Sequence, residues 1–156
     1  HLGVDRAVSV GTPIHAPADG LIVWAANPAD TNGGYLGNWA GYPYGAGNNI
    51  AMLVRVNDTT YFVSFSHMAQ YGMTVSAGDS VSQGDVIGLT GNSGNSSGAH
   101  CHIEIINLGS MSISKAASQF ASTAVFAWGC GWSSPSTGCD SKGSTPCRER
   151  PETLIG

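Results

Sequence analysis

Residues 98–104 have the sequence GAHCHIE, in which two histidines stand two apart in a segment typical of a β-strand. Because successive side chains of a strand point to opposite faces, His100 and His102 are expected on one face and Cys101 on the other. Two imidazoles on one rigid face favour a metal site or a proton-transfer site. The chain contains five histidines, and four of them lie in segments that a single site could recruit.

The composition favours a secreted or cell-surface β-protein. A chain of 156 residues is most simply one domain, and it is long enough to bury a core of its own. Only 10% of the residues are charged, so neutral polar groups carry much of the surface. The net charge is −4, and the sequence contains no run of basic residues. It therefore has neither the basic patch typical of nucleic-acid-binding proteins nor the polybasic segment that binds anionic membranes.

No apolar stretch approaches the roughly 20 residues that a membrane-spanning helix needs, so no membrane insertion is expected. No leader precedes His1, and we expect a mature or trimmed secreted protein.

The four cysteines are Cys101, Cys130, Cys139 and Cys147, which allow three complete pairings. A zinc knuckle is the alternative for them, but no C-x-x-C spacing is present. We therefore expect at least one disulfide in the tail, which implies an oxidising compartment.

The pattern along the chain predicts a mainly β fold of short antiparallel strands with one peripheral helix near the C-terminus. The expected elements are a hairpin over 12–26, strands over 49–56 and 60–66, paired short strands over 75–81 and 84–90, and a helix over 113–124. A turn at Asn57-Asp58 is expected to join the two longer strands, and Ser112 is expected to cap the helix. Residues 27–48, rich in Gly, Asn and aromatic side chains, are expected to form a functional loop.

His1 and Asp5 supply donors that the histidine pair lacks. An imidazole and a carboxylate are good zinc ligands, so His1, Asp5 and one of the paired histidines would give three protein ligands. The fourth tetrahedral position would then remain for water, whose pKa zinc lowers to about 7. The remaining histidines could move protons or stabilise a developing oxyanion.

Five segments of the chain, in this order, resemble the lysostaphin-type (LytM-like) zinc peptidoglycan endopeptidases. They are HLGVD at 1–5, GTPIHAPADG at 11–20, SHM at 66–68, VSQGDVIGLTGNSG at 81–94 and GAHCHIE at 98–104. The resemblance runs from His1 to about Ile106. It implies a compact antiparallel β domain with a zinc-bearing groove. Residues 1–110 would form the catalytic core, and residues 111–156 a helix with a cysteine-bearing extension of the same domain.

The same resemblance implies roles for the site residues. His1, Asp5 and His102 would hold one zinc ion, while His67 and His100 would act as general base or oxyanion stabiliser, with the division between them open. The implied activity is hydrolysis of peptide bonds in bacterial peptidoglycan by metal-activated water, without a covalent intermediate. The protein is expected to be a monomer that is secreted or associated with the cell wall.

One acidic residue and one further histidine in these motifs have less specific interpretations. Glu104 is expected on the face of His102, where it is either a partner that orients an imidazole or a structural carboxylate. His15 lies at a position where the family carries no catalytic residue, and we expect it to serve in packing or at the surface.

The chain departs from the family pattern in three places. The family has a strand ahead of its first metal histidine, and here that piece is either missing from the chain or dispensed with. Cys101 replaces an aliphatic residue, and the extension is additional. Cys101 is either a small buried hydrophobe or a partner for a tail cysteine.

Two other functions stay open. One is a catalytically silent relative that binds the wall or acts as a regulator. The other is a copper site that pairs His1 with a second histidine, as in polysaccharide monooxygenases. The motifs do not indicate which peptidoglycan bond is cleaved.

Overall fold

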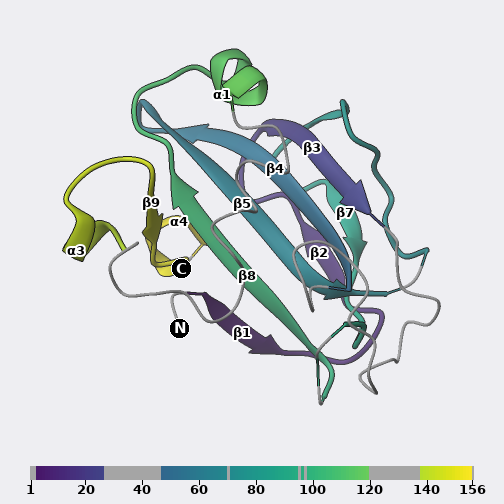
Figure 1. Cartoon of the computed structure of the whole chain (residues 1–156). Coiled ribbons are helices and arrows are strands. Elements are labelled where there is room, and N and C mark those ends of the chain that lie inside the picture. Colours follow the sequence, from purple (N-terminus) through teal and green to yellow (C-terminus); the bar gives the residue numbers. More distant parts are fainter. Residues whose placement is uncertain are drawn as a thin grey trace.

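The computed structural model describes residues 3–26, 47–69, 71–94, 96, 98–119 and 138–155, and it is mainly antiparallel β-sheet (Figure 1). The strands are β1 (Val4–Ala7), β2 (Pro13–His15), β3 (Gly20–Ala26), β4 (Asn48–Val56), β5 (Thr59–Met68), β6 (Ser80–Val81), β7 (Val86–Leu89), β8 (His100–Asn107) and β9 (Cys147–Glu149). The helices are α1 (Ile113–Gln119), α3 (Cys139–Lys142) and α4 (Glu152–Ile155). None of the helices in the described ranges is long and apolar enough to cross a membrane.

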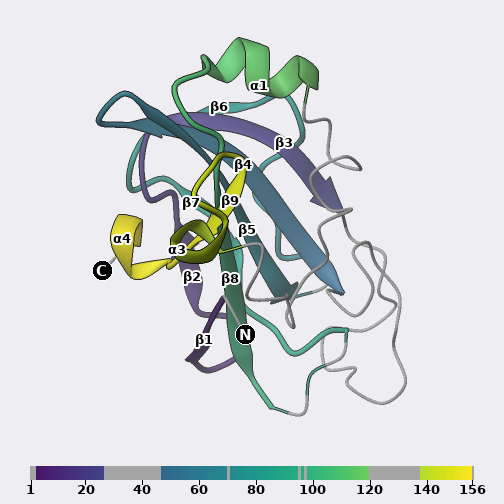
Figure 2. The ribbon, with the colours of Figure 1, turned by 60° about the vertical axis from the view of Figure 1, so that its left-hand side comes forward.

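The strand β8 organises the main sheet. Seven strands form this sheet in the order β1-β8-β5-β4-β3-β6, with β9 also paired to β8, and β2 pairs with β7 in a second sheet. One edge of β8 pairs with β5, while β1 and β9 share its other edge, one after the other (Figures 1 and 2). The histidine-bearing strand is therefore held by three other strands.

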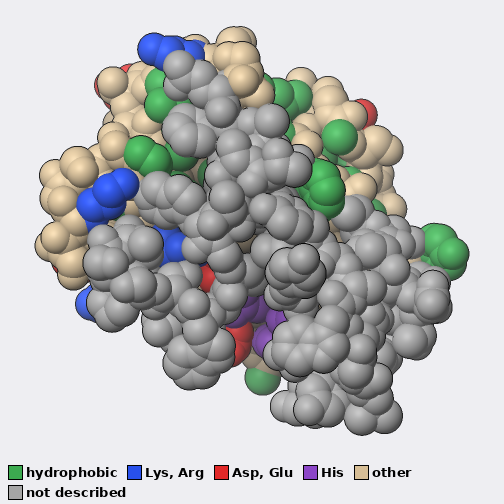
Figure 3. Space-filling view, viewed as in Figure 1, with side chains coloured by type: hydrophobic (Ala, Val, Ile, Leu, Met, Phe, Trp, Pro, Cys, Tyr) green, Lys and Arg blue, Asp and Glu red, His purple; other side chains and the backbone are tan. Residues whose placement is uncertain are grey.

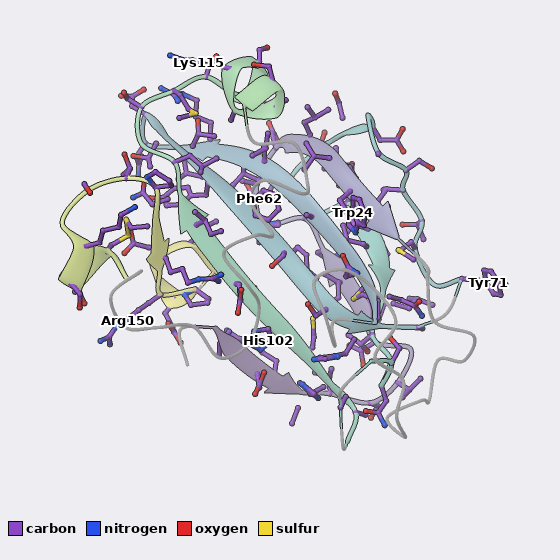
Figure 4. All side chains as sticks on the ribbon, in the orientation of Figure 1. Trp24, Phe62, Tyr71, His102, Lys115 and Arg150 are labelled. Carbon is purple, nitrogen blue, oxygen red and sulfur yellow. A yellow bond between two sulfur atoms is a disulfide. The ribbon has the colours of Figure 1, made fainter. Side chains whose placement is uncertain are left out.

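The two faces of β8 have different surroundings. Cys101, Ile103 and Ile105 lie in the larger core cluster, together with buried side chains of β4 and β5. On the other face, Ile106 joins a smaller apolar cluster that includes Phe62 of β5 and Ala116 of α1. Figure 4 shows Phe62 toward the α1 end of the sheet and His102 toward the β1 end. The same face is thus apolar near the helix and polar at the histidines.

Local signals predicted several elements correctly. The β4–β5 turn has Asn57 and Asp58 at φ values of 50° and 62°, the left-handed conformation that a two-residue hairpin turn requires. Helix α1 begins after Ser112, whose Oγ accepts a hydrogen bond from the backbone N–H of Lys115 at 3.1 Å, as expected of an N-cap. The expected continuation of the helix over 120–124 lies outside the described residues, as does almost all of the 27–48 loop.

The two expected local pairings are wrong. The 12–26 hairpin does not form, because β2 pairs with β7 while β3 pairs with β4 and β6. The segments 75–81 and 84–90 likewise pair with β3 and β2 rather than with each other. Long-range packing decides these partners, since Ile22 of β3 and Ile87 of β7 are both fully buried in one core cluster. Local alternation identifies a strand but not its neighbour in space.

The cysteines divide into a disulfide and a buried thiol. Cys139 and Cys147 are bonded, which confirms the expected tail disulfide. Cys101 is a free thiol with 1% exposure, and burial raises its pKa to about 12, so it packs as a small neutral hydrophobe. Cys130 lies outside the described residues.

Candidate active site

Strands β1 and β8 bring a carboxylate to the paired histidines. Asp5 lies opposite His102 in the β1–β8 register, and its Oδ1 is 2.6 Å from Nδ1 of His102 and 3.8 Å from Nε2 of His100. The His102 side chain is only 4% exposed, whereas that of Asp5 is 52% exposed. In Figure 3, histidine and acidic side chains adjoin one another on this face. The site is therefore open on the Asp5 side.

A bulge at the end of β5 brings His67 to the same place. Ser66 pairs with His102, so the next residue of a regular strand would point to the opposite face. The β4–β5 register shifts between Asn48 and Ile50, and His67 adopts a φ of 62°, which is unusual for a residue other than glycine. Bulges re-aim side chains beside functional sites. The imidazole of His67 consequently lies 4.6 Å from that of His100 and 6.3 Å from that of His102, between ring centroids.

Backbone carbonyls fix the tautomers of His67 and His100. Nδ1 of His67 lies 2.7 Å from the carbonyl oxygen of Ser93, and Nδ1 of His100 lies 2.7 Å from that of Gly98. A carbonyl only accepts, so each Nδ1 must carry the hydrogen. In a neutral ring the lone pair is then on Nε2. Burial lowers the pKa of His67 to about 4, which the Ser93 bond partly opposes and the neighbouring His100 reinforces, so this ring is neutral at neutral pH.

Buried hydrogen bonds hold the loop that supplies the Ser93 carbonyl. The Ser93 hydroxyl donates to the carbonyl of Met68 at 2.6 Å and accepts from the backbone N–H of Asn48 at 3.1 Å. The backbone N–H of Gly91 donates to the carbonyl of His67 itself at 3.0 Å. The orientation of His67 is therefore set by the loop as well as by its strand.

His102 lies between two carboxylates. Its Nε2 donates to Oε1 of Glu104 at 2.9 Å, and its Nδ1 faces Asp5. Burial alone would lower the pKa of His102, but the hydrogen bonds and negative charges of Glu104 and Asp5 outweigh it and raise the pKa above 6.5. The other oxygen of Glu104, Oε2, accepts from Nη1 of Arg148. Arg148 belongs to β9, and no motif in the sequence indicated it.

The glycine of the HLGVD segment makes room for His102. A Cβ atom at Gly3 would lie 2.6 Å from Cε1 and 2.7 Å from Nε2 of His102, and 2.8 Å from the carbonyl oxygen of Ile103. These separations are shorter than van der Waals contact, so only glycine fits against this ring. The sequence motif contained this glycine, but its reason appears only in three dimensions.

Gly3→Ala is expected to displace the His102 ring and to destabilise the protein by about 1–3 kcal/mol, the usual cost of overpacking. Urea unfolding measures the stability, and the ¹⁵N resonances of the His102 imidazole in metal-free protein report the displacement. Gly98→Ala is the matched control, because a Cβ there meets nothing within 4 Å. Unchanged His102 resonances in the Gly3 variant would contradict the close packing described above.

The donors at this site are of the kinds that zinc prefers. An imidazole nitrogen and a carboxylate oxygen converge between His102 and Asp5, and a cation could take the place of the hydrogen that they share. Within the described residues, no three His, Cys, Asp or Glu side chains are placed to hold a metal ion. The third expected ligand, His1, lies outside the described residues.

His15 is separate from this group. It is exposed on β2, where its Nδ1 bonds to the carbonyl of Gly84 at 2.8 Å. It lines a cavity of about 450 Å³ together with Phe65 and Ile103, which belong to the opposite face of the main sheet. Four of the expected site residues thus lie close together, namely Asp5, His67, His100 and His102, and Glu104 contacts His102 on its buried side.

Comparison with known proteins matches the region that contains these residues. The model of a family described as Peptidase family M23 matches residues 1–114. Among curated proteins, Peptidoglycan DD-endopeptidase ShyA of Vibrio cholerae is 34% identical over 106 residues, which are 68% of this chain and 20% of that protein. The chain therefore spans about a fifth of the length of this relative.

Solved structures agree with this match. The catalytic domain of the antimicrobial peptidase lysostaphin from Staphylococcus simulans aligns with a TM-score of 0.52 and 32% identity, over 73% of this chain and 71% of that chain. A zinc-containing peptidase from Vibrio cholerae aligns with a TM-score of 0.51 and 26% identity, over 69% of this chain and 27% of that chain.

Proposed function

The chain belongs to peptidase family M23, and from this premise we propose that it is a zinc endopeptidase that hydrolyses peptide bonds in bacterial peptidoglycan. One observation carries the proposal. The Asp5 carboxylate and Nδ1 of His102 converge at 2.6 Å, beside two histidines whose Nδ1 atoms are both committed to backbone carbonyls. Two metal donors and two proton acceptors in one place are what such a hydrolase requires.

In this proposal His1, Asp5 and His102 hold one zinc ion. When bound, zinc acts as a Lewis acid that lowers the pKa of water and polarises a carbonyl group. Glu104 orients His102 by accepting its Nε2 hydrogen, which leaves Nδ1 as the nitrogen that faces Asp5. The open Asp5 side of the site would admit the substrate, while the buried side fixes the ligand geometry.

His67 and His100 supply the proton chemistry. Each has an Nε2 lone pair in its neutral form, because its Nδ1 hydrogen is bonded to a carbonyl. One ring takes a proton at Nε2 as the attacking water forms a bond to the scissile carbonyl carbon, and it returns this proton to the leaving amine as the carbon–nitrogen bond breaks. The other ring, with a proton taken up from solvent, donates a hydrogen bond from Nε2 to the oxygen that becomes negative. The bulge at His67 and the Ser93 carbonyl hold the His67 ring 4.6 Å from that of His100, between ring centroids.

The names of the matched proteins support the choice of substrate. ShyA is named a peptidoglycan DD-endopeptidase, and lysostaphin is described as an antimicrobial peptidase. We extend this substrate class to the present chain, and with it a secreted or wall-associated location and action as a monomer.

Removing zinc is expected to abolish hydrolysis, and returning one equivalent of zinc is expected to restore it. Purified peptidoglycan is the substrate, and the release of new amino groups is the measurement. Elemental analysis of protein purified without added metal gives the metal content. Full activity after exhaustive chelation would contradict the proposal. Binding to peptidoglycan without release of amino groups would indicate the silent relative, and copper in place of zinc would indicate the histidine-brace alternative.

A further inference from the structure

The C-terminal extension contributes a strand to the sheet beside the active site. The family match ends at residue 114, whereas β9 (Cys147–Glu149) lies well beyond it. β9 pairs with residues 105–107 of β8, and β1 pairs with residues 100–103 (Figures 1 and 2). The part of the chain outside the family region therefore adjoins the strand that carries the histidines.

One residue of β9 reaches toward these histidines. Arg148 lies opposite Ile106, so it shares the face of Glu104 and His102 and can reach the diagonal neighbour Glu104. Its side chain is only 1% exposed, and its Nη1 donates to Oε2 of Glu104, whose own side chain is 5% exposed. A buried arginine is rare unless it is paired, and this one is paired with a carboxylate of the site.

The contacts form a buried chain from β9 to β1. Arg148 binds Oε2 of Glu104, Oε1 of Glu104 accepts from Nε2 of His102 at 2.9 Å, and Nδ1 of His102 faces Asp5 at 2.6 Å. The guanidinium compensates a carboxylate that is otherwise costly to bury. By holding one carboxylate oxygen, it leaves the other directed at Nε2. The hydrogen on Nε2 then determines that Nδ1 is the nitrogen presented to Asp5.

The extension holds Arg148 in place by local restraints. The disulfide from Cys139 ends at Cys147, the residue before Arg148. Within the same loop, Nζ of Lys142 donates to the carbonyl of Pro146 at 2.6 Å. These restraints limit the freedom of β9 and hence the cost of fixing a long side chain.

We propose that Arg148 is a positioning residue of the metal centre, which holds the His102 ring through Glu104 with Nδ1 directed at Asp5. The extension thereby completes a site whose other described residues all lie within the family region. The inference rests on the proposed zinc function, because it assigns Arg148 a role toward the zinc ligand His102.

Arg148→Met is the test, because methionine keeps much of the apolar stem and removes the charged donor. We expect the affinity for zinc, measured by competition with a chromophoric chelator, to fall by about 10–100-fold, as for partners that orient metal ligands. We expect kcat on peptidoglycan to fall with it, with a smaller change in KM. In the metal-free protein, the His102 Nε2–H resonance is expected to shift, because the Glu104 acceptor is no longer fixed.

Arg150→Met is the matched control. Arg150 lies two residues further along, its side chain is 81% exposed, and its guanidinium is 4.0 Å from Asp140 (Figure 4). This variant is expected to match the wild type in zinc affinity and in the His102 resonance. Arg148→Lys keeps the charge but not the planar donor group, so an intermediate loss of zinc affinity is expected. If Arg148→Met does not fold, the zinc affinity and the His102 resonance of Arg148→Lys test the proposal instead.

The outcomes separate this inference from the proposed function. If the wild type neither binds zinc nor hydrolyses peptidoglycan, the proposed function fails, and the His102 resonance of the metal-free variants still tests the link from Arg148. If the wild type binds zinc and is active, a folded Arg148 variant with wild-type zinc affinity and an unchanged His102 resonance overturns this inference alone. A loss of thermal stability without either change would show that Arg148 only stabilises the fold.

Discussion

Replacing His102 by alanine is expected to abolish zinc binding and to lower peptidoglycan hydrolysis by at least about 10³-fold. Of the two proposed ligands within the described residues, His102 is the buried one, and its ring is held from both sides by Asp5 and Glu104. Its loss leaves two of the three proposed ligands, and a metal ion supplies several kcal/mol of transition-state stabilisation that would be lost with it. Elemental analysis and the release of amino groups from peptidoglycan measure the two effects.

His15→Ala is the control for the His102 substitution. His15 is exposed on β2, and its cavity lies on the other face of the sheet, so this variant should keep its zinc and its activity. The His102→Ala protein must also remain folded for the comparison, which circular dichroism and thermal unfolding establish. A folded His102→Ala variant that still cleaves peptidoglycan at the wild-type rate would refute the proposed zinc site.

Replacing His67 or His100 by alanine is expected to lower kcat by about 10²–10⁴-fold while the protein keeps its zinc. The reason is that both rings lie beside Asp5 and His102 without being needed as metal ligands, and each directs Nε2 away from its carbonyl partner. Single-substitution variants assayed on peptidoglycan, with metal content measured on the same samples, separate loss of chemistry from loss of metal.

The double variant His67→Ala/His100→Ala adds a sharper comparison. If the two rings act in one step, the double variant should be little slower than the slower single variant, because residues that act as a unit are not additive. His15→Ala again serves as control, since His15 makes the same kind of Nδ1 bond to a carbonyl, that of Gly84, at 2.8 Å. Zinc lost from either single variant would instead assign that histidine to the metal.

The sequence predicted the histidine pair of β8 well, because the two-residue period of a strand is a local property. His100 and His102 share a face, and Ser112 caps the helix. The family was likewise recognised from five short motifs, and the match over residues 1–114 confirms it. These features depend on residue types at fixed spacing, which a single sequence displays directly.

The partners of the strands were not predictable in the same way. β2 and β3 follow one another closely and were expected to pair, yet they belong to different sheets. The outcome depends on Ile22 and Ile87 entering one buried cluster, which is a contact between residues far apart in the chain. Hydrophobic burial is not directional, so its partners follow from the whole fold rather than from a local pattern.

The position of the His67 ring in the site likewise could not be predicted from the sequence. A regular strand would have turned its ring away from His102, because Ser66 already faces that side. Only the register shift against β4 and the left-handed backbone at His67 bring the ring within 4.6 Å of His100. A bulge is a property of two paired strands, and a sequence of one strand does not reveal it.

By itself the sequence determined which donor types this protein offers, their order along the chain, and the strand that presents two of the histidines. Tertiary structure alone decided which groups act on those donors, since it placed Gly3 against the His102 ring and Arg148 of the extension behind Glu104. The physical reason is that a ligand's identity is covalent, whereas its orientation comes from packing and hydrogen bonds between segments distant in the chain.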